Sequence, residues 1–474
     1  MNLLEETKSL LKRYDVRPLR RIGQNFCVDP KLLESLVKYS RVNGDDIILE
    51  VGAGFGFLTE LLSKSAKEVM AIEVDPKLVK ALRDKFSAKD NVKIIEGDVL
   101  KTSLPPFDKV VANPPYSISS PLIMNILEKK FTSAVLTLQD EFCKRMTAKE
   151  GNQEYGSLSV VTNVKANIKC LEQIPRSSFY PQPEVKSRIV LIEPKERPPN
   201  LKDEKLFFSL TKSLFTERNK KLGNALQVYF LKKTSVDKAE VKKLFEDFPY
   251  LESRVRSLKP EEIVEIANRL YEISKSRKIS VEGNSFYIFP EVYMPSDDTF
   301  LLAEQIKRET DCKRCLDIGT GCGILGILMA KKAQEIVAVD VNPHAVECTK
   351  LNSRMNALSE KIEVKYSNLF DSISGRFDLI VCNPPYLPCT EDTGEELAKA
   401  WDGGPSGRRM IDQFLRDAPR FLEKDGRILI IQSSLSNSEK TIRILEESHF
   451  KVEIIIKEKL DFEELVVIKA VYED

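Results

Sequence analysis

The chain has 474 residues, of which 42% are hydrophobic and 31% charged, a composition typical of globular proteins with more than one domain. No apolar run approaches the length of a membrane span, and the N-terminus lacks the cationic start and apolar core of a signal peptide. The nine cysteines are scattered and odd in number, which argues against a disulfide framework, so we expect a cytoplasmic protein with free thiols.

Residues 1–195 alternate short β-branched runs with amphipathic helical stretches. Residues 45–64 predict a strand, a glycine turn and a helix, and residues 68–86 predict a strand, an acidic turn and a helix. Two further strands are predicted over 91–98 and 107–115. Because strands and helices alternate, we expect an α/β domain with a parallel sheet and helices on both of its faces.

A charged, proline-rich stretch at Glu193–Asn200 predicts a joint before a second segment, residues 196–280. This segment lacks alternating strands. Its apolar residues recur every three or four positions, the helical signal, over 204–231, 236–248 and 259–274. We therefore expect a small all-helical domain, which a polar joint at Ser274–Ser285 separates from the rest of the chain.

Residues 281–474 repeat the rhythm of the first segment. Strand, turn and helix recur over 315–333 and 335–352. The glycines and the acid of the first segment return 267 positions later, with Gly52, Gly54, Gly56 and Glu73 matching Gly319, Gly321, Gly323 and Asp340. The tetrapeptide Asn-Pro-Pro-Tyr occurs at Asn113–Tyr116 and, 270 positions later, at Asn383–Tyr386. The order and spacing predict two domains of one architecture.

Positively and negatively charged residues are unevenly distributed along the chain. Residues 1–280 hold 49 Lys and Arg against 38 Asp and Glu, an excess of 11 positive charges. The remaining 24 basic and 34 acidic residues leave an excess of 10 negative charges in residues 281–474. A basic first part favours a nucleic-acid partner, and an acidic last part favours a different one.

The glycine turn and the acid together indicate a nucleoside-bearing cofactor. A Gly-x-Gly-x-Gly turn after a strand allows a ligand to approach the backbone near a helix N-terminus. An acid after the second strand, Glu73 or Asp340, can accept hydrogen bonds from a ribose diol. These two features do not separate NAD from S-adenosylmethionine.

The Asn-Pro-Pro-Tyr motif indicates a pocket for a planar amino group. Asn113 offers a side-chain carbonyl, and the adjoining prolines hold a backbone carbonyl outward because their φ angle is restricted. Two acceptors suit an –NH2 group, and Tyr116 offers a flat face to a planar substrate. Such a site positions the amine for attack on an electrophilic methyl group without a strong base. The alternative is a simple strand-ending turn, which a second ordered copy disfavours.

These motifs resemble the class I, Rossmann-like S-adenosylmethionine-dependent methyltransferases that methylate amino groups. Residues 15–278 resemble the KsgA/Dim family through Gly23–Asp29, Phe179–Ser187 and Phe215–Leu226. That family dimethylates two adjacent adenosines near the 3′ end of small-subunit ribosomal RNA. The resemblance implies that the basic helical domain binds RNA. Its positive charge suits this role, because RNA phosphates are contacted by Lys and Arg side chains.

The same resemblance implies the site residues of the first domain. The target adenine would be held by Asn113, Pro114, Tyr116 and Phe179. The cofactor would be contacted by Gln24, Asn25, Cys27, Gly52, Gly54, Glu73, Asp98 and Asn113. Cys27 departs from the family, in which leucine is usual at this position.

Residues 285–474 resemble the HemK/PrmC family in its short archaeal and eukaryotic form, through Tyr293–Leu302, Asn383–Pro388 and Ala400–Leu415. That family methylates the glutamine amide of the Gly-Gly-Gln loop in class I release factors, and the short form works with a small zinc-binding activator subunit. The substrate amide would be held by Asn383, Pro384 and Tyr386. The cofactor would be contacted by Gly319, Gly321, Gly323, Asp340, Asn368, Leu369 and Asn383.

The prediction is therefore a bifunctional methyltransferase that acts on the small ribosomal subunit and on a release factor, without a membrane partner. Two alternatives stay open for the last domain: methylation of a nucleic-acid guanine or a protein lysine, and a cofactor-binding or ribosome-assembly module without turnover. No metal site is predicted, because Cys312 and Cys315 have no second cysteine pair and the histidines His344 and His449 form no cluster. Trp401 is predicted to pack beside the second pocket.

Overall fold

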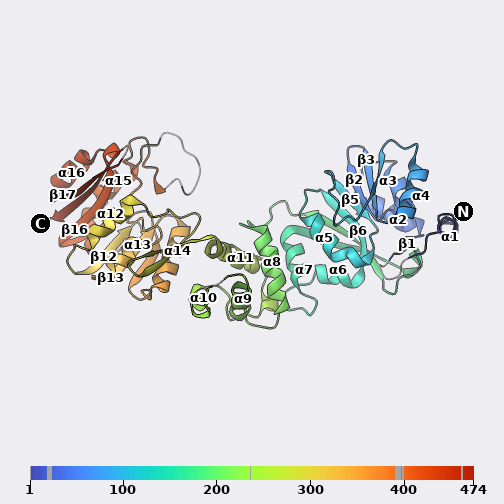
Figure 1. The fold of residues 1–474 in the computed structure, drawn as a ribbon, viewed down its shortest axis with the longest axis horizontal. Coiled ribbons are helices and arrows are strands. Elements are labelled where there is room, and N and C mark those ends of the chain that lie inside the picture. The colour runs from blue at the N-terminus through green and yellow to red at the C-terminus, as the bar shows by residue number, and fades with distance from the viewer. Residues whose placement is uncertain are drawn as a thin grey trace. The chain divides into compact units, whose positions relative to one another are not determined.

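The computed structural model describes residues 2–18, 24–234, 236–389, 397, 400–460 and 463–473 (Figure 1). The chain forms two compact units. The first consists of Met1–Lys232 with Phe248–Asn268, and the second of Lys233–Asp247 with Arg269–Asp474. In the parts of the chain that the structure describes, no helix is long and apolar enough to cross a membrane.

The first unit contains a seven-stranded sheet in the order β4-β3-β2-β5-β6-β9-β7. The strands β4 to β6 are parallel, whereas β9 and β7 are each antiparallel to their neighbours. The strands are β2 (Ile47–Val51), β3 (Glu68–Glu73), β4 (Val92–Glu96), β5 (Lys109–Ala112), β6 (Ser133–Gln139), β7 (Ala166–Ile174) and β9 (Ser187–Pro194).

The helices around this sheet begin where the sequence favours a helix start. Asp29 and Asp75 cap α2 and α4 by accepting hydrogen bonds from backbone N–H groups, and a proline follows each cap at the first helical position. The helices are α1 (Leu3–Arg13), α2 (Pro30–Ser40), α3 (Phe57–Leu62), α4 (Pro76–Phe86), α5 (Ser119–Leu127), α6 (Asp140–Met146) and α7 (Ser157–Lys165). Two short strands, β1 (Phe26–Cys27) and β8 (Phe179–Tyr180), pair with each other outside the main sheet.

The segment predicted to be helical contains α8 (Glu204–Thr216), α9 (Leu222–Leu231), α10 (Lys238–Leu244) and α11 (Pro260–Lys275). It is shared between the units: α8 and α9 belong to the first, α10 belongs to the second, and α11 passes from one to the other after Asn268. The boundaries 1–195, 196–280 and 281–474 therefore stay predictions from sequence composition.

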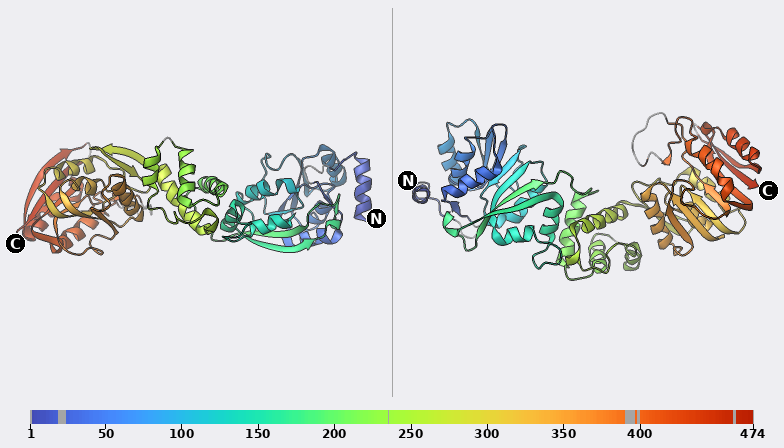
Figure 2. Two further views of the ribbon diagram at one scale, coloured as in Figure 1. Left: turned by 90° about the horizontal axis from the view of Figure 1, so that it is seen from below. Right: turned by 180° about the vertical axis from the view of Figure 1, so that it is seen from behind.

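The second unit repeats the strand order of the first, as β14-β13-β12-β15-β16-β18-β17. Helices flank the sheet strands of each unit (Figure 1, Figure 2). Its strands are β12 (Cys312–Ile318), β13 (Ala333–Asp340), β14 (Ile362–Tyr366), β15 (Phe377–Cys382), β16 (Leu422–Ser433), β17 (Phe450–Lys459) and β18 (Glu464–Tyr472). Its helices are α12 (Asp297–Ile306), α13 (Ile324–Met329), α14 (Pro343–Met355), α15 (Arg409–Asp417) and α16 (Ser438–Glu447), and a hairpin of β10 (Arg277–Val281) and β11 (Asn284–Ile288) precedes them.

Each sheet is the centre of its unit's core. The central parallel strands are almost continuously apolar and buried, as expected for strands covered on both faces, whereas the edge strands β4 and β14 are mostly half-buried or exposed. In the second unit, Leu316, Ile380 and Ile428 from three neighbouring strands are fully buried in one cluster with Phe414 of α15. Burying each such side chain contributes roughly 1.5–3 kcal/mol. The predicted fold class, two Rossmann-like α/β domains with a helical segment between them in the chain, is confirmed.

Candidate active sites

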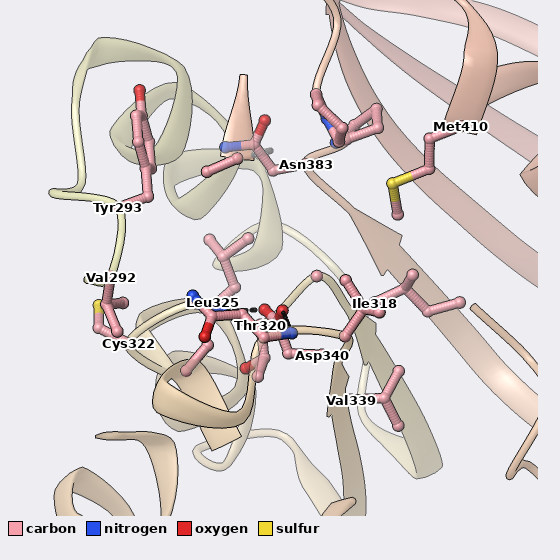
Figure 3. A pocket seen from close by; sticks show the side chains of 18 of the residues that line it. Val292, Tyr293, Ile318, Thr320, Cys322, Leu325, Val339, Asp340, Asn383 and Met410 are labelled. Carbon is pink, nitrogen blue, oxygen red and sulfur yellow. Dashed lines mark hydrogen bonds between the residues drawn. The ribbon is translucent and has the colours of Figure 1, made fainter. Parts of the chain in front are cut away.

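Both candidate sites lie at the carboxyl ends of the central parallel strands, where open α/β sheets bind their ligands. In the second unit these ends surround a cavity of about 570 Å³ (Figure 3). In the first unit the corresponding cavity has a volume of only about 80 Å³. Phe26 lines this cavity, where its ring stacks on Phe55 at a centroid distance of 5.1 Å and lies against Gly54.

The glycine turns bring the first strand of each unit close to the Asn-Pro-Pro-Tyr motif. Gly52 and Gly319 have φ angles of +73° and +72°, which L-residues with a side chain rarely adopt. A Cβ atom on Gly52 would lie 3.2 Å from the side chain of Pro115, and one on Gly319 would lie 3.7 Å from the backbone oxygen of Asn383. A side chain at Gly52 would therefore crowd the motif, whereas at Gly319 the contact would be an ordinary one and the positive φ alone favours glycine.

The predicted ribose-binding acids hold the turns in place. Glu73 accepts hydrogen bonds from the backbone N–H groups of Gly54 at 3.0 Å and Val74 at 2.9 Å. Asp340 does the same with Gly321 and Asn342, both at 2.9 Å. Burial raises the pKa of both carboxyls, against the effect of these hydrogen bonds. Each acid therefore joins the end of the second strand to the turn after the first.

A second buried carboxyl lies under each turn, and the sequence reasoning did not assign it. Burial raises the pKa of Glu50 to about 8 and that of Asp317 to about 6. Asp317 accepts hydrogen bonds from the hydroxyl of Thr320 at 2.6 Å and the N–H of Gly326 at 3.0 Å. The internal repeat could have identified this pair, because Glu50 and Asp317 are 267 positions apart, as the matching glycines of the two turns are.

In the first unit, the motif is held by one residue just before β1 and by one on β9. The side-chain nitrogen of Asn113 donates a hydrogen bond to the backbone oxygen of Asn25 at 3.2 Å. The hydroxyl of Tyr116 is hydrogen-bonded to that of Ser187, and burial raises the pKa of Tyr116 to about 12. Tyr116 therefore stays protonated and fixed, and the carbonyl oxygen of Asn113 remains available as an acceptor.

In the second unit, one carboxylate holds the motif. Oδ2 of Asp298 accepts hydrogen bonds from the side-chain nitrogen of Asn383 at 3.0 Å and from the hydroxyl of Tyr386 at 3.1 Å. Asp298 is 5% exposed, and its Oδ1 accepts from the backbone N–H of Thr299 at 2.6 Å. A carboxylate accepts hydrogen bonds and does not donate them, so it fixes the nitrogen of Asn383 toward itself and leaves the oxygen for a ligand.

Most of the predicted site residues come together. The first cavity is lined by Gln24, Asn25, Cys27, Gly52, Gly54, Glu73, Asn113, Pro114 and Tyr116. The second is lined by Gly319, Gly321, Asp340, Asn368, Leu369, Asn383, Pro384 and Tyr386. Trp401 and Met410 also line the second cavity, and Figure 3 shows Met410 beside it with Tyr293 and Asn383.

Three predicted residues do not line the cavities. Phe179 is 2% exposed and belongs to the core with Cys27 and Ile189, so its predicted stacking on the target base stays a prediction. The Asp98 side chain is 37% exposed and accepts a hydrogen bond from the backbone N–H of Leu100. Gly323 precedes α13 as its N-cap, where a Cβ would lie 2.8 Å from the side chain of Thr349.

Comparison with known proteins assigns both halves of the chain. The family model for ribosomal RNA adenine dimethylase matches residues 19–271, and that for the methyltransferase small domain matches residues 296–462. Both are families of S-adenosylmethionine-dependent methyltransferases, so the fold and the two cavities belong to that class of enzyme. The chain belongs to the ribosomal RNA adenine dimethylase family, and it carries a methyltransferase small domain after the dimethylase part.

The similar proteins agree with this assignment for the first part. The chain is 39% identical over 271 residues to the "Probable ribosomal RNA small subunit methyltransferase A" of Methanosarcina mazei, which covers 57% of this chain and 98% of that protein. It is 40% identical over 263 residues to the protein of the same name from Pyrococcus abyssi, covering 56% and 96%. A dimethyladenosine transferase structure from Plasmodium falciparum matches with 28% identity and a TM-score of 0.45, covering 53% and 98%.

Proposed function

We propose that the first part of the chain dimethylates N6 of two adjacent adenosines near the 3′ end of small-subunit ribosomal RNA. The second part methylates the side-chain amide of glutamine in the Gly-Gly-Gln motif of a class I release factor. The observation that carries both proposals is the pair of Asn-Pro-Pro-Tyr motifs, each beside a glycine turn and an acid in a methyltransferase domain. Both substrates offer a planar, conjugated –NH2 group.

The residues of both cavities fit S-adenosylmethionine. The turn at Gly321 has open space beside it, so a ligand can approach its backbone closely, whereas at the first turn the Phe26 ring already lies against Gly54. Glu73 and Asp340 place a carboxylate at the end of the second strand, where a ribose diol would donate hydrogen bonds. When bound, S-adenosylmethionine supplies an electrophilic methyl group.

The motif residues would position the amine and accept its hydrogen bonds. The carbonyl oxygens of Asn113 and Asn383 are available because hydrogen bonds hold the amide nitrogens elsewhere. Together with the backbone carbonyl between the two prolines, each would draw the –NH2 protons away from the nitrogen lone pair. These acceptors also stabilise the positive charge that develops on nitrogen during attack, before a proton leaves.

The negative charge of Asp298 distinguishes the second site from the first. A carboxylate that contacts both Asn383 and Tyr386 adds electrostatic stabilisation to a nitrogen that becomes cationic. An amide nitrogen is a weaker nucleophile than an aromatic amine, because its lone pair is delocalised into the carbonyl. The additional charge therefore supports an amide as the substrate of the second site.

The charge distribution and the class of substrate suggest the partners. The excess of 11 positive charges in residues 1–280 suits ribosomal RNA, and the excess of 10 negative charges in residues 281–474 suits a protein substrate. We propose the release factor and a small zinc-binding activator subunit as partners of the second part. Both reactions serve translation, so we propose the cytoplasm as the place of action.

One labelling experiment tests both assignments. The full chain is incubated with methyl-labelled S-adenosylmethionine and either immature small ribosomal subunits or a release factor with its activator. Asn113→Ala is expected to abolish label on the RNA alone, and Asn383→Ala on the release factor alone. If either variant abolished both activities, the proposal of two independent sites would be wrong. Label on guanine or lysine, or none with the release factor, would refute the second substrate.

A further inference from the structure

Two cysteine thiols of the first unit lie in contact, outside the cavity that holds the Asn-Pro-Pro-Tyr motif. Cys143 is buried on α6, whereas Cys170 is exposed on β7, the edge strand of the sheet. The thiol of Cys143 donates a hydrogen bond to the sulfur of Cys170. The two residues are 27 positions apart in the chain, so the fold brings them together.

Hydrogen bonds from β9 hold the helix and the edge strand beside each other at this place. Nε of Arg188 donates to Oδ1 of Asp140, the first residue of α6, at 2.6 Å. Nη1 of the same guanidinium donates to the backbone oxygen of Leu171 at 3.0 Å. One side chain thus joins the helical turn before Cys143 to the residue after Cys170. The pairing of β7 with β9 is irregular directly after Cys170, and such a bulge re-aims side chains.

The surroundings of the pair make Cys170 the more reactive thiol. The hydrogen bond from Cys143 lowers the pKa of Cys170 to about 6, with smaller contributions from Thr147 and from the positive charge of Arg188. The same hydrogen bond, together with burial, raises the pKa of Cys143. At neutral pH Cys170 is therefore an exposed thiolate, the form that attacks disulfides, and its neighbour keeps a proton. An accessible thiolate next to a second cysteine is the arrangement that forms reversible disulfides.

We propose that Cys143 and Cys170 form a reversible disulfide, with a small soluble disulfide such as oxidised glutathione as the oxidant. The Cys170 thiolate attacks one sulfur of oxidised glutathione, whose S–S bond breaks and releases one glutathione thiolate. Cys143 gives its proton to this thiolate and attacks the sulfur of Cys170, which releases the second glutathione. The second glutathione takes its proton from water. The two protein thiols lose two electrons, and oxidised glutathione gains them.

The disulfide lies beside the strand that supports the first Asn-Pro-Pro-Tyr motif. Ser187, whose hydroxyl is hydrogen-bonded to that of Tyr116, directly precedes Arg188 on β9. In the sheet, β9 lies between β6 and β7, and α6 packs against all three strands. A covalent link between α6 and β7 therefore restrains the strand that holds Tyr116.

Mass spectrometry of the full-length chain tests the proposal. The reduced protein is incubated with oxidised glutathione at neutral pH, and the remaining thiols are then alkylated. We expect two of the nine thiols to be lost and one pair of peptides to be joined through Cys143 and Cys170. Cys143→Ala should stop at the mixed disulfide, with one glutathione on Cys170. Cys170→Ser should form no linkage and carry no glutathione on Cys143. The matched control is Cys389→Ser, which removes a half-buried cysteine elsewhere and should form the same linkage.

The pH dependence of alkylation gives a second readout. Alkylation of Cys170 by iodoacetamide should reach half of its maximal rate at about pH 6, and this midpoint should rise in Cys143→Ala, which lacks the hydrogen-bond donor. An unchanged midpoint would overturn the proposal, as would the absence of a linkage or a linkage of Cys312 to Cys315 alone. Thermal unfolding shows whether the variants are folded. Because Cys170 is exposed, Cys170→Ser keeps the test decisive if Cys143→Ala is unstable.

Discussion

Asp298→Asn tests whether one buried carboxylate positions the second Asn-Pro-Pro-Tyr motif. The substitution keeps the size of the side chain but removes its charge. In Asp298, Oδ2 accepts from Asn383 and Tyr386 and Oδ1 accepts from Thr299, so in either orientation the new –NH2 group faces donors in place of an acceptor. The Asn383 amide is then held less firmly, although its 3.3 Å hydrogen bond to the Thr299 hydroxyl remains. We expect the release-factor methylation rate to fall, while RNA methylation by the first part stays unchanged.

The size of the rate decrease follows from the energy of the hydrogen bond that is lost. A hydrogen bond to a charged group contributes about 1.5–3 kcal/mol, and each 1.36 kcal/mol corresponds to about tenfold in rate. Losing one such interaction to Asn383 therefore predicts a decrease in kcat of about 10- to 100-fold. The KM for S-adenosylmethionine should change less, because the glycine turn and Asp340 remain intact.

The matched control is Asp297→Asn, because Asp297 is adjacent in α12 but exposed to solvent. The assay compares single-turnover rates of both variants with those of the unaltered chain, and thermal unfolding confirms that both are folded. If Asp298→Asn and Asp297→Asn had equal rates, Asp298 would not position the motif. A loss of cofactor affinity with unchanged kcat would instead assign Asp298 to cofactor binding.

Three further predictions concern the glycine turns and the buried acids. Asp340→Ala should reduce the number of S-adenosylmethionine molecules bound per chain from two to one in a calorimetric titration, and an unchanged stoichiometry would contradict its role. Gly323→Ala should destabilise the second unit by about 1–3 kcal/mol in urea unfolding. Its Cβ would meet the side chain of Thr349 at 2.8 Å, so the cost should exceed that of Gly321→Ala, where the positive φ is the only penalty. The carboxyl of Glu50, with a pKa of about 8 against 4.5, binds a proton more readily in the folded state, so stability should decrease as pH rises from about 5 to 8. Glu50→Gln should flatten this decrease in unfolding curves measured across that range, and an unchanged slope would refute the link.

Much of the fold could be predicted because its signals are local or repeated. Alternating apolar runs and helical stretches predicted the strands from Ile47 to Ala112 and from Cys312 to Cys382. The acidic turn before Pro76 and the periodic apolar residues after it predicted the helix that α4 forms, because these signals lie close together in the chain. The internal repeat then implied that both domains share one topology, and their identical strand orders confirm it.

The parts of the sites that could be predicted are the motifs that directly follow a strand. Parallel strands align their carboxyl ends, so the glycine turn, the acid and the Asn-Pro-Pro-Tyr motif had to meet once the strands were identified. The prediction was incomplete where a residue acts through a long-range contact. Asp298 is 85 positions from Asn383, and its sequence neighbours do not reveal that its carboxylate contacts the motif. Phe179 lies in the core of the first unit, and its predicted role at the base-binding site stays a prediction.

The sequence by itself determined that this protein contains two α/β domains of one architecture, because the periodicity, the turns and the repeated motifs are present along the chain, and the resemblance of these motifs added the methyltransferase class. Only the tertiary structure decided how each motif is held: a backbone carbonyl of Asn25 in the first domain and the carboxylate of Asp298 in the second. Only the structure, too, brought Cys143 of α6 into contact with Cys170 of β7. Hydrogen bonds and charge pairs depend on distances of a few ångströms, and for residues far apart in the chain those distances exist only after folding.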